Sequence, residues 1–421
     1  MPKVSVDQHL SAAVQARQAG RADEATRHFS AVVDIDPTHP LARNALGLDA
    51  LARGDARTAA GHFERAVEGD PAAAALWMNL AKARRLQGDD EGEQAALEGA
   101  LGIDQTHLMA LIRMAELHER RGELAAAAGR WSGVVALGTQ IPNPPPELAA
   151  TFARARESVA RQRKVLEAKL ESALAEEVGR ASERDRRRAT AAADRLIGKR
   201  RIFVNECHGF HYPFLPADEF FDRAHFPWFA ELEAATPIIR EELAAILAAP
   251  DPGLVPYIDM PSGTPENIWT RLDHSLDWGS LHLWKDGERI DGACARAPKT
   301  AAIVDKMPLC HIRGRAPHVF FSILKAGKTI PPHTGVTNVR AIVHLPLIVP
   351  GDCAFRVGGE TREWREGEAF AFDDTIEHEA WNRSDRDRAV LILDAWNPHM
   401  SEHEQAMVRS MFAAMAAARD G

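Results

Sequence analysis

The chain has 421 residues, more than one ordinary hydrophobic core supports, so we expect two or three domains. Hydrophobic residues make up 45% of the chain and charged residues 26%, which is typical of a globular protein and not of a disordered one. The formal net charge of −9 argues against electrostatic binding of nucleic acid, and no apolar run is long enough to predict a membrane span.

Cysteine content and the first residues bear on the cellular compartment. The opening stretch from Met1 to Asp7 lacks the apolar core of a secretory signal, so we expect a cytoplasmic protein. Neither a disulfide scaffold nor a zinc ribbon is expected, because no CxxC pair occurs among the four cysteines, Cys207, Cys294, Cys310 and Cys353.

A repeat of 34 residues runs through the first third of the chain. Glycines recur at this interval, and so do large apolar residues: Gly20, Gly54, Gly88 and Gly122, then Phe29, Phe63, Leu97 and Trp131. Each unit predicts two amphipathic helices with a glycine bend between them, and Asp-Pro ends the second helix in two of the units. The period resembles that of tetratricopeptide repeats over about residues 4–138, and it argues against a generic helical bundle.

We therefore predict that residues 1–140 form an all-α tetratricopeptide-repeat solenoid. Such arrays usually hold a peptide or protein partner on a concave face, so the resemblance implies a peptide or protein as substrate or partner. The alternative is that the array only spaces or dimerises the rest of the chain.

Residues 141–200 are predicted to be a boundary and a linker. The stretch from Ile141 to Pro146 contains four prolines and stops helical structure. From Glu147 to about Arg195 the sequence predicts a charged helix with a narrow apolar stripe. The basic run from Arg184 to Arg188 has nearby acidic residues, so we favour a solvated helix face over a nucleic-acid patch.

Residues 201–421 have a different composition. Proline and glycine punctuate short apolar runs, and beyond Pro317 strand follows strand with alternating polar and apolar residues. This pattern predicts an all-β barrel or a double-sheet jelly roll with flanking helices, and the stretch from Ser401 to Ala417 predicts a closing helix.

Candidate metal ligands lie within this β region. His333 stands just before an alternating strand, His378 follows about 45 residues later, and Arg388 lies ten residues beyond. Imidazoles on opposing strands can present two nitrogens to one divalent metal, and the guanidinium fork suits a carboxylate. From spacing alone, a structural or surface role for either histidine remains open.

Several motifs between about Phe203 and Pro398 together resemble the aspartyl/asparaginyl β-hydroxylases, a branch of the Fe(II)/2-oxoglutarate dioxygenases. They are Phe321-Ser322-Ile323, Pro332-His333-Thr334-Gly335, Thr337-Asn338-Val339-Arg340, His344-Leu345, Phe372-Asp373-Asp374, Glu377-His378-Glu379 and Arg388. The animal enzymes also carry a tetratricopeptide-like region ahead of the catalytic domain, so the order of domains agrees. The resemblance implies a double-stranded β-helix, jelly-roll or cupin-like, for residues 201–421.

The resemblance also implies how iron is held. His333 and His378 match the iron ligands, and Gly335 stands where the wider superfamily has a carboxylate ligand. Asp374 matches the carboxylate that holds a metal-bound water in this branch. The missing carboxylate ligand also fits a halogenase, but the surrounding motif argues against that reading.

Four further residues are matched to the co-substrate. Arg388 and Ser322 match the groups that hold the distal carboxylate of 2-oxoglutarate, and His344 matches a residue near its chelating end. Arg340 lies on the same strand face and is assigned to co-substrate or substrate, with a structural salt bridge as the alternative. Ile342 stands where an animal member has arginine, which would suit an acidic substrate, so the substrate preference of the animal enzyme stays open for this chain.

The resulting hypothesis is an enzyme that uses Fe(II), 2-oxoglutarate and O2 to hydroxylate a side-chain carbon, such as the β-carbon of Asp or Asn in a peptide or protein. Two alternatives stay open: an adaptor with a catalytically silent β domain, and a hydroxylase of a small molecule or lipid. Animal relatives have a disulfide near Cys294 and Cys310, but we expect both thiols to stay reduced.

Overall fold

The computed structural model describes residues 5–420, so residues 1–4 of the predicted solenoid and of the opening stretch lie outside the described part. The chain divides into two compact units, Met1–Glu176 and Glu177–Gly421. The division falls inside the stretch 141–200 that the sequence predicts to be a boundary.

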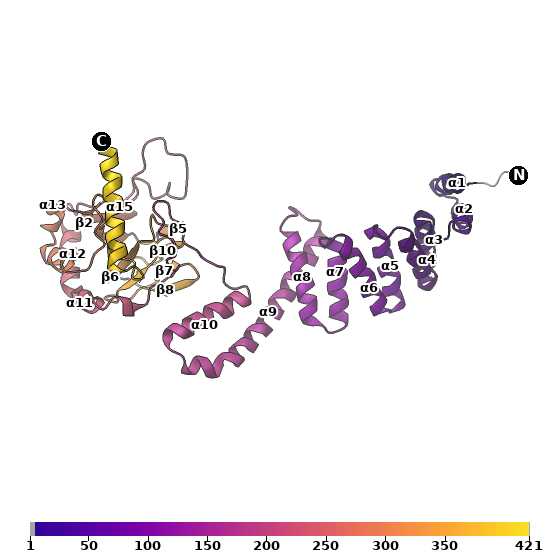
Figure 1. The fold of residues 1–421 in the computed structure, drawn as a ribbon, viewed down its shortest axis with the longest axis horizontal. Helices are drawn as coiled ribbons and strands as arrows, with labels where there is room; N and C mark the ends of the chain where they lie inside the picture. The colour runs from indigo at the N-terminus through magenta and orange to yellow at the C-terminus, as the bar shows by residue number, and fades with distance from the viewer. Residues whose placement is uncertain (1–4, 421) are drawn as a thin grey trace. The chain divides into compact units, whose positions relative to one another are not determined.

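The first unit contains the predicted helical repeats, as eight helices that pack in consecutive pairs (Figure 1). They are α1 (Val6–Gln18), α2 (Ala22–Ile35), α3 (Pro40–Ala52), α4 (Ala56–Gly69), α5 (Ala74–Gln87), α6 (Asp90–Ile103), α7 (Leu108–Arg120) and α8 (Leu124–Gly138). The four predicted bend glycines have φ between 72° and 81°, a left-handed conformation that glycine adopts without steric cost. The prediction of a helical repeat array followed by a β-rich domain is confirmed.

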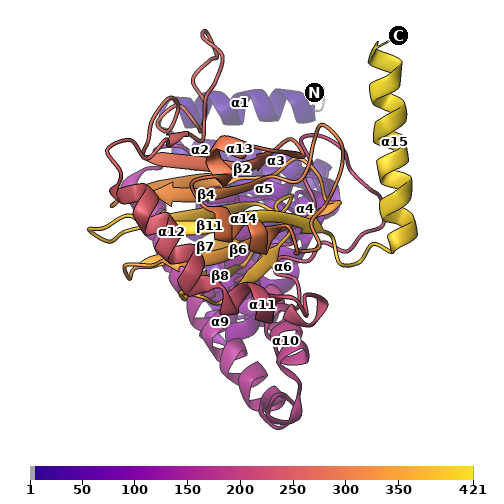
Figure 2. The ribbon, with the colours of Figure 1, turned by 90° about the vertical axis from the view of Figure 1, so that its left-hand side faces the viewer.

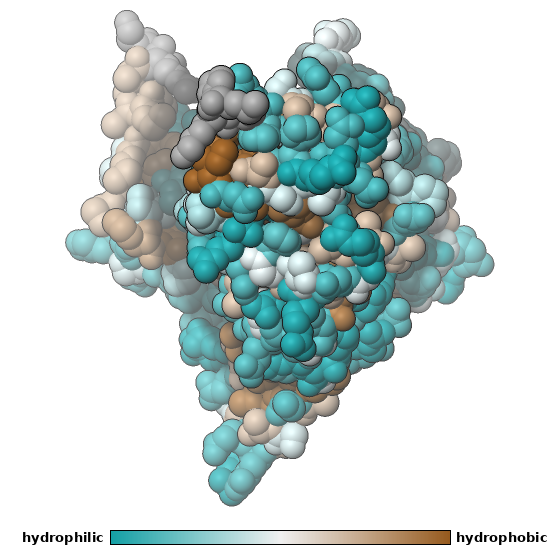
Figure 3. Space-filling view, turned by 90° about the vertical axis from the view of Figure 1, so that its right-hand side faces the viewer, coloured by the Kyte–Doolittle hydropathy of each residue, from teal (hydrophilic) through white to brown (hydrophobic). Residues whose placement is uncertain are grey.

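The repeat core explains why the large apolar positions recur. Phe29, Phe63, Leu97 and Trp131 are all buried between paired helices. A Cβ built at Gly47 would collide with the Phe63 ring, so a small residue is needed for the close approach of α3 and α4. The surface of the array that faces the viewer in Figure 3 is mainly hydrophilic, with small separate apolar patches.

The charged linker forms two helices and not the single helix that the sequence predicts. The first, α9 (Pro146–Arg180), packs Phe152 and Ala155 into the apolar core of the array. The second, α10 (Glu183–Leu196), begins at Ser182, whose Oγ accepts a hydrogen bond from the Asp185 backbone N–H at 3.2 Å. This N-cap starts a new helix and so breaks the continuous pattern.

The second unit is built on two antiparallel sheets. The larger sheet has the order β1-β2-β4-β11-β6-β9 with β3 paired to β2, and the smaller has the order β5-β10-β7-β8. The strands are β1 (Val255–Pro256), β2 (Trp278–Lys285), β3 (Glu288–Arg289), β4 (Val319–Leu324), β5 (Thr329–His333), β6 (Arg340–Ile348), β7 (Cys353–Val357), β8 (Glu360–Glu363), β9 (Phe370–Phe372), β10 (His378–Asn382) and β11 (Arg388–Trp396).

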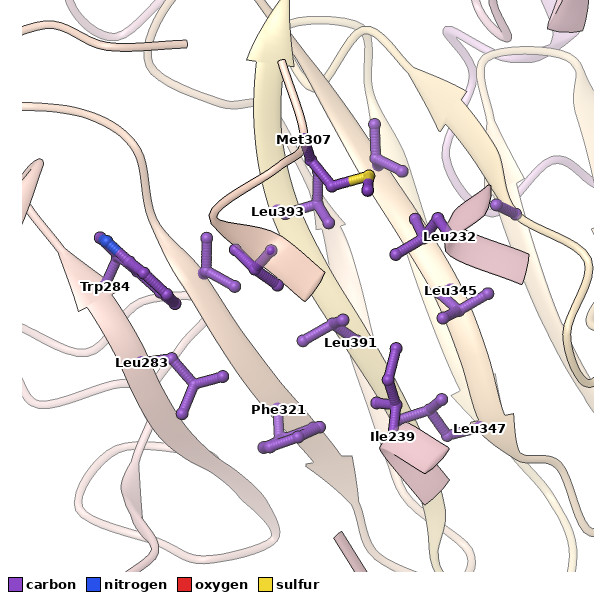
Figure 4. Close-up of a cluster of buried hydrophobic side chains, with 14 of the residues drawn as sticks. Leu232, Ile239, Leu283, Trp284, Met307, Phe321, Leu345, Leu347, Leu391 and Leu393 are labelled. Carbon is purple, nitrogen blue, oxygen red and sulfur yellow. The ribbon is translucent and has the colours of Figure 1, made fainter. Parts of the chain in front are cut away.

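The two faces of the larger sheet have different partners. One face packs under helices through a core that includes Phe321, Leu345 and Leu391 (Figure 4). The other face shares a second apolar cluster with the smaller sheet, through residues such as Phe320 and Phe355. Because side chains alternate along a strand, each long strand sends every second residue into the space between the sheets.

The flanking helices are η1 (Arg223–His225), α11 (Phe229–Ala234), α12 (Thr236–Ala248), α13 (Asp291–Cys294), α14 (Pro298–Val304) and α15 (Glu402–Asp420). Helices α12 and α14 lie across the larger sheet (Figure 2). Cys294 and Cys310 are both buried and unbridged. No helix within residues 5–420 is both long enough and apolar enough to cross a membrane.

Candidate functional site

A cavity of about 430 Å³ lies between the two sheets of the second unit. All seven residues that the sequence singles out line this cavity: Ser322, His333, Arg340, His344, Asp374, His378 and Arg388. They come from β4, β5, β6, β10 and β11 and from the loop before β10. The topology therefore gathers at one place residues that are up to 66 positions apart in the chain.

The two histidines face each other across neighbouring strands. His333 ends β5, His378 begins β10, and the two are direct cross-strand partners with ring centroids 4.0 Å apart. Each Nδ1 lies within hydrogen-bond distance of a backbone carbonyl, at 2.8 Å from Pro331 O and 3.0 Å from Ile376 O. Donation from Nδ1 to those carbonyls leaves both Nε2 atoms free as acceptors, which is the tautomer that metal-binding histidines use.

Burial lowers the pKa of both imidazoles, so each is neutral and able to bind a metal near pH 7. For His378 the neighbouring His333 lowers the pKa further. Nowhere in residues 5–420 do three or more His, Cys, Asp or Glu side chains form a metal-binding group. The cavity therefore offers a metal two imidazole nitrogens.

Gly335 and Asp374 occupy complementary positions beside the histidine pair. A Cβ built at Gly335 would collide with the Asp374 carboxylate, so that carboxylate fills the space that a side chain at position 335 would need. The Gly335 backbone N–H also donates to the Asp374 backbone carbonyl at 2.6 Å. Burial raises the pKa of Asp374 to about 7, and its buried Oδ1 has no hydrogen-bond partner within the described part of the chain.

Arg388 is a buried cation without an anion. Its side chain is only 2% exposed, and among residues 5–420 it has no hydrogen-bond or ion-pair partner. Its guanidinium lies 4.5 Å from the centre of the Trp364 ring, a cation–π contact. Burial lowers the pKa of Arg388 to about 10, so it still carries its charge at neutral pH.

Arg340, by contrast, lies beside two carboxylates. It donates to Asp394 Oδ2 at 2.7 Å and lies 3.8 Å from Asp374 Oδ2. Burial alone would lower the pKa of Arg340, but the two carboxylates raise it above its ordinary value. This arrangement is the buried salt bridge that the sequence leaves open as the alternative role of Arg340.

Ser322 and His344 lie on the same inner face of the larger sheet. The Ser322 Oγ accepts a hydrogen bond from Trp278 Nε1 at 3.0 Å, which fixes the hydroxyl in the cavity wall. His344 is packed among aromatic rings, and its buried Nδ1 has no hydrogen-bond partner in the described structure. Burial holds the pKa of His344 well below its usual value, with the charge of Arg388 as a second cause.

Several residues that line the cavity are not among those that the sequence patterns indicate. Tyr257 and Trp269 come from the loop before β2, and the Trp269 ring packs edge-on against His333 with centroids 4.7 Å apart. His282 and Phe320 line the cavity from β2 and β4. Alternation along β2 could have indicated His282, but no local pattern in the loop marks Tyr257 or Trp269.

A family model described as "Aspartyl/Asparaginyl beta-hydroxylase" matches residues 233–398. The aspartyl/asparaginyl beta-hydroxylase of Homo sapiens is 37% identical over 131 residues, which is 31% of this chain and 17% of that protein. The ornithine lipid ester-linked acyl 2-hydroxylase of Rhizobium tropici is 33% identical over 216 residues, 49% of this chain and 73% of that protein. The chain thus spans 17% of the length of the human enzyme and most of the bacterial one.

Among solved structures, a MamA protein is 18% identical with a TM-score of 0.33, covering 40% of this chain and 93% of that one. YrrB, a TPR protein, is 15% identical with a TM-score of 0.33, covering 38% of this chain and 79% of that one. The family model spans residues 233–398, which include strands that line the cavity. This match and the sequence relatives show that the chain is a member of the aspartyl/asparaginyl β-hydroxylase family, a family of hydroxylases.

Proposed function

We propose that the chain hydroxylates an unactivated carbon with Fe(II), 2-oxoglutarate and O2. The observation that carries the proposal is the combination of two facing imidazoles with free Nε2 atoms and one buried guanidinium without an anion, all in one cavity. A buried charge without a partner is costly to the folded protein, so its retention favours a ligand that brings the opposite charge.

The residues that line the cavity fit both Fe(II) and 2-oxoglutarate. His333 and His378 would hold the iron through Nε2, and the carboxylate of Asp374, beside Gly335, would hold water at the place of a third ligand. Arg388 with Ser322 would bind the distal carboxylate of 2-oxoglutarate, and His344 would lie near its other end. Arg340 already has two carboxylates, so we assign it to positioning Asp374 in preference to binding an anion.

When bound, iron and 2-oxoglutarate supply oxidation by O2: one oxygen atom enters a C–H bond of the substrate to form C–OH, and the other enters succinate as CO2 leaves. The protein orients the two imidazoles and excludes water from the site. The Nδ1–carbonyl hydrogen bonds fix the orientation of both imidazoles, and the rings of Phe355 and Phe372 lie beside His378 and exclude water from it.

For the substrate we propose a side-chain carbon in a peptide or protein, Asp or Asn in the first instance, with the helical array recruiting it. An acyl chain of a lipid is the second candidate, because the bacterial relative is an acyl 2-hydroxylase. A silent β domain in an adaptor is disfavoured by the presence of His333, His378 and Arg388 in one cavity.

Anaerobic addition of Fe(II) and 2-oxoglutarate to the full chain tests the proposal, because chelation of the keto acid gives a weak visible metal-to-ligand absorption band. The band is expected in the wild type and should be lost in His333→Ala and in His378→Ala. As a matched control, His211→Ala removes a histidine that does not line the cavity and should keep the band. A band that survives both cavity substitutions would refute the metal assignment.

A further inference from the structure

The guanidinium of Arg388 has N–H donors that no residue accepts from. Among residues 5–420 its side chain has no hydrogen-bond or ion-pair partner, although it is only 2% exposed. None of its nitrogens is a fully enclosed unpaired atom, whereas Arg340 Nε is one, so the N–H groups of Arg388 reach the cavity. A long side chain without partners has several rotamers of similar energy. Some other contact is therefore needed to hold Arg388 in one orientation.

Arg340, at the other end of the cavity, is held by a carboxylate. Its Nη1 donates to Asp394 Oδ2 at 2.7 Å. Asp394 lies six residues beyond Arg388 on β11, which is about 20 Å at the usual rise of a strand. Such a bond fixes a guanidinium but occupies N–H donors that a ligand could otherwise use. A carboxylate beside Arg388 would orient it at the same loss.

Trp364 holds Arg388 through a contact that needs no acceptor atom. The residue directly follows β8 and lines the cavity. The central guanidinium carbon of Arg388 lies over its ring, 4.5 Å from the ring centroid. The face of the indole attracts the cation but has no oxygen to accept from it, so the N–H groups stay available for the two oxygens of a carboxylate.

The ring of Trp364 is itself held in place. Phe355 and Phe370 contact it edge on, with centroids 5.7 and 5.8 Å away and ring planes at 83° and 86° to the indole. The backbone N–H of Trp364 donates to the Cys353 carbonyl at 3.4 Å, and the residue is 6% exposed. A ring packed in this way turns only if its neighbours move. Trp364 can therefore impose one orientation on the guanidinium that lies over it.

The same indole lies against His344. The two ring centroids are 5.4 Å apart and the ring planes differ by 30°. Arg388 and His344 are matched to opposite ends of the keto acid, so one rigid ring contacts a residue at each end. Trp364 thereby sets the position of Arg388 relative to the rest of the co-substrate site.

The indole nitrogen indicates why this residue is a tryptophan. Trp364 Nε1 is a buried donor without an acceptor in the described part of the chain. An unpaired buried donor is costly to the folded protein, and a phenylalanine here would avoid that cost. Tryptophan is, however, the aromatic residue that attracts a cation most strongly. The unpaired nitrogen is therefore consistent with a ring retained for its π-face.

We propose that Trp364 is a positioning residue for the keto acid, and that its ring orients the Arg388 guanidinium toward the distal carboxylate. The inference rests on the proposed function and adds a residue outside the motifs of the family resemblance. Trp364 acts through Arg388, so its effect depends on the presence of that arginine.

Trp364→Met and Trp364→Phe separate the π-face from the rest of the side chain. Glutarate, which has the distal carboxylate but no keto group, is titrated by calorimetry into the metal-free full chain in a chelating buffer. 2-Oxoglutarate is titrated anaerobically at fixed Fe(II), with the visible band as readout. Trp364→Met should weaken both ligands about tenfold, and Trp364→Phe less than about threefold. The band at saturating 2-oxoglutarate should keep its wild-type intensity, because the histidine pair is intact.

Trp284→Met is the matched control. Trp284 is also 6% exposed and has Arg289 over its ring at 5.6 Å, but it lies outside the cavity. The variant should lower the free energy of unfolding, as Trp364→Met does, and leave both affinities as in the wild type. In the background of Arg388→Met, Trp364→Met should change the affinity for 2-oxoglutarate by less than about twofold, because the two residues act as a unit.

Equal losses of affinity in Trp364→Met and Trp364→Phe would overturn the proposal, since the π-face would then not matter. Unchanged affinities in Trp364→Met would overturn it too, as would a loss that persists in the Arg388→Met background. Should Trp364→Met not fold, Trp364→Leu replaces it as the variant without a ring. If the wild type shows neither the anaerobic band nor binding of glutarate, the proposed function itself fails and this inference falls with it.

Discussion

The two ends of the cavity each hold one buried arginine, and the two guanidiniums differ in what surrounds them. Arg340 lies between Asp394 and Asp374, with a hydrogen bond of 2.7 Å to the first. Arg388 lies over the face of Trp364 and has no acidic partner within residues 5–420. Burial lowers the pKa of Arg388 to about 10, whereas the carboxylates raise the pKa of Arg340.

The difference supports the proposal that Arg340 has a structural role and that Arg388 binds an anion. A buried ion pair is satisfied in the free protein, so removing one partner leaves an uncompensated charge. A buried cation without a partner destabilises the free protein and is satisfied only when an anion arrives.

The largest expected effect is on folding, from Arg340→Met. The substitution leaves Asp394 and Asp374 buried together without a cation, which should lower the free energy of unfolding by about 3–5 kcal/mol. Urea unfolding followed by tryptophan fluorescence measures it, because seven of the nine tryptophans lie after residue 201. A change close to zero would mean that the ion pair does not contribute to stability.

The next effect is on binding, from Arg388→Met. Loss of a charge-assisted contact to a carboxylate should weaken 2-oxoglutarate binding by about 2–3 kcal/mol, or roughly 30- to 150-fold. Anaerobic titration of the visible band with 2-oxoglutarate at fixed Fe(II) measures the affinity. The band at saturating 2-oxoglutarate serves as control, since the histidine pair is intact; an unchanged affinity would refute the role of Arg388.

The smallest expected effect is on the free energy of unfolding, and its sign is opposite to that of Arg340→Met. In the absence of ligands, Arg388→Met removes a buried charge that has no partner, so it should raise the free energy of unfolding by about 1–2 kcal/mol. The same urea titration in a chelating buffer measures it. Destabilisation by this variant would show that Arg388 has a stabilising partner in the free protein and would remove the main argument for an anion site.

Much of this organisation could be predicted from the sequence, because periodic signals are local. The interval of 34 residues fixes the positions of Phe63 and Trp131 in the repeat core. Alternation along the strands places Arg340 and His344 on one face of β6, and the structure has both lining the cavity.

Other features depend on contacts between distant segments and have no local signature. The pairing of Arg340 with Asp394 joins residues 54 positions apart, so alternation alone could not separate its role from that of Arg388. Tyr257 and Trp269 reach the cavity from a loop in which both rings lie against the distant Trp278 ring. The break at Ser182 depends on one N-cap hydrogen bond within an otherwise helical pattern.

The central claim is that two imidazoles and one unpaired guanidinium form a single site for a metal and a keto acid. A crystal structure of the full chain grown anaerobically with Mn(II) in place of Fe(II) and with 2-oxoglutarate tests it most directly. We predict anomalous scattering from Mn(II) between His333 Nε2 and His378 Nε2, with the distal carboxylate of 2-oxoglutarate on Arg388 and Ser322. Metal bound elsewhere, or a keto acid bound at Arg340 while Arg388 stays unpaired, would contradict the account.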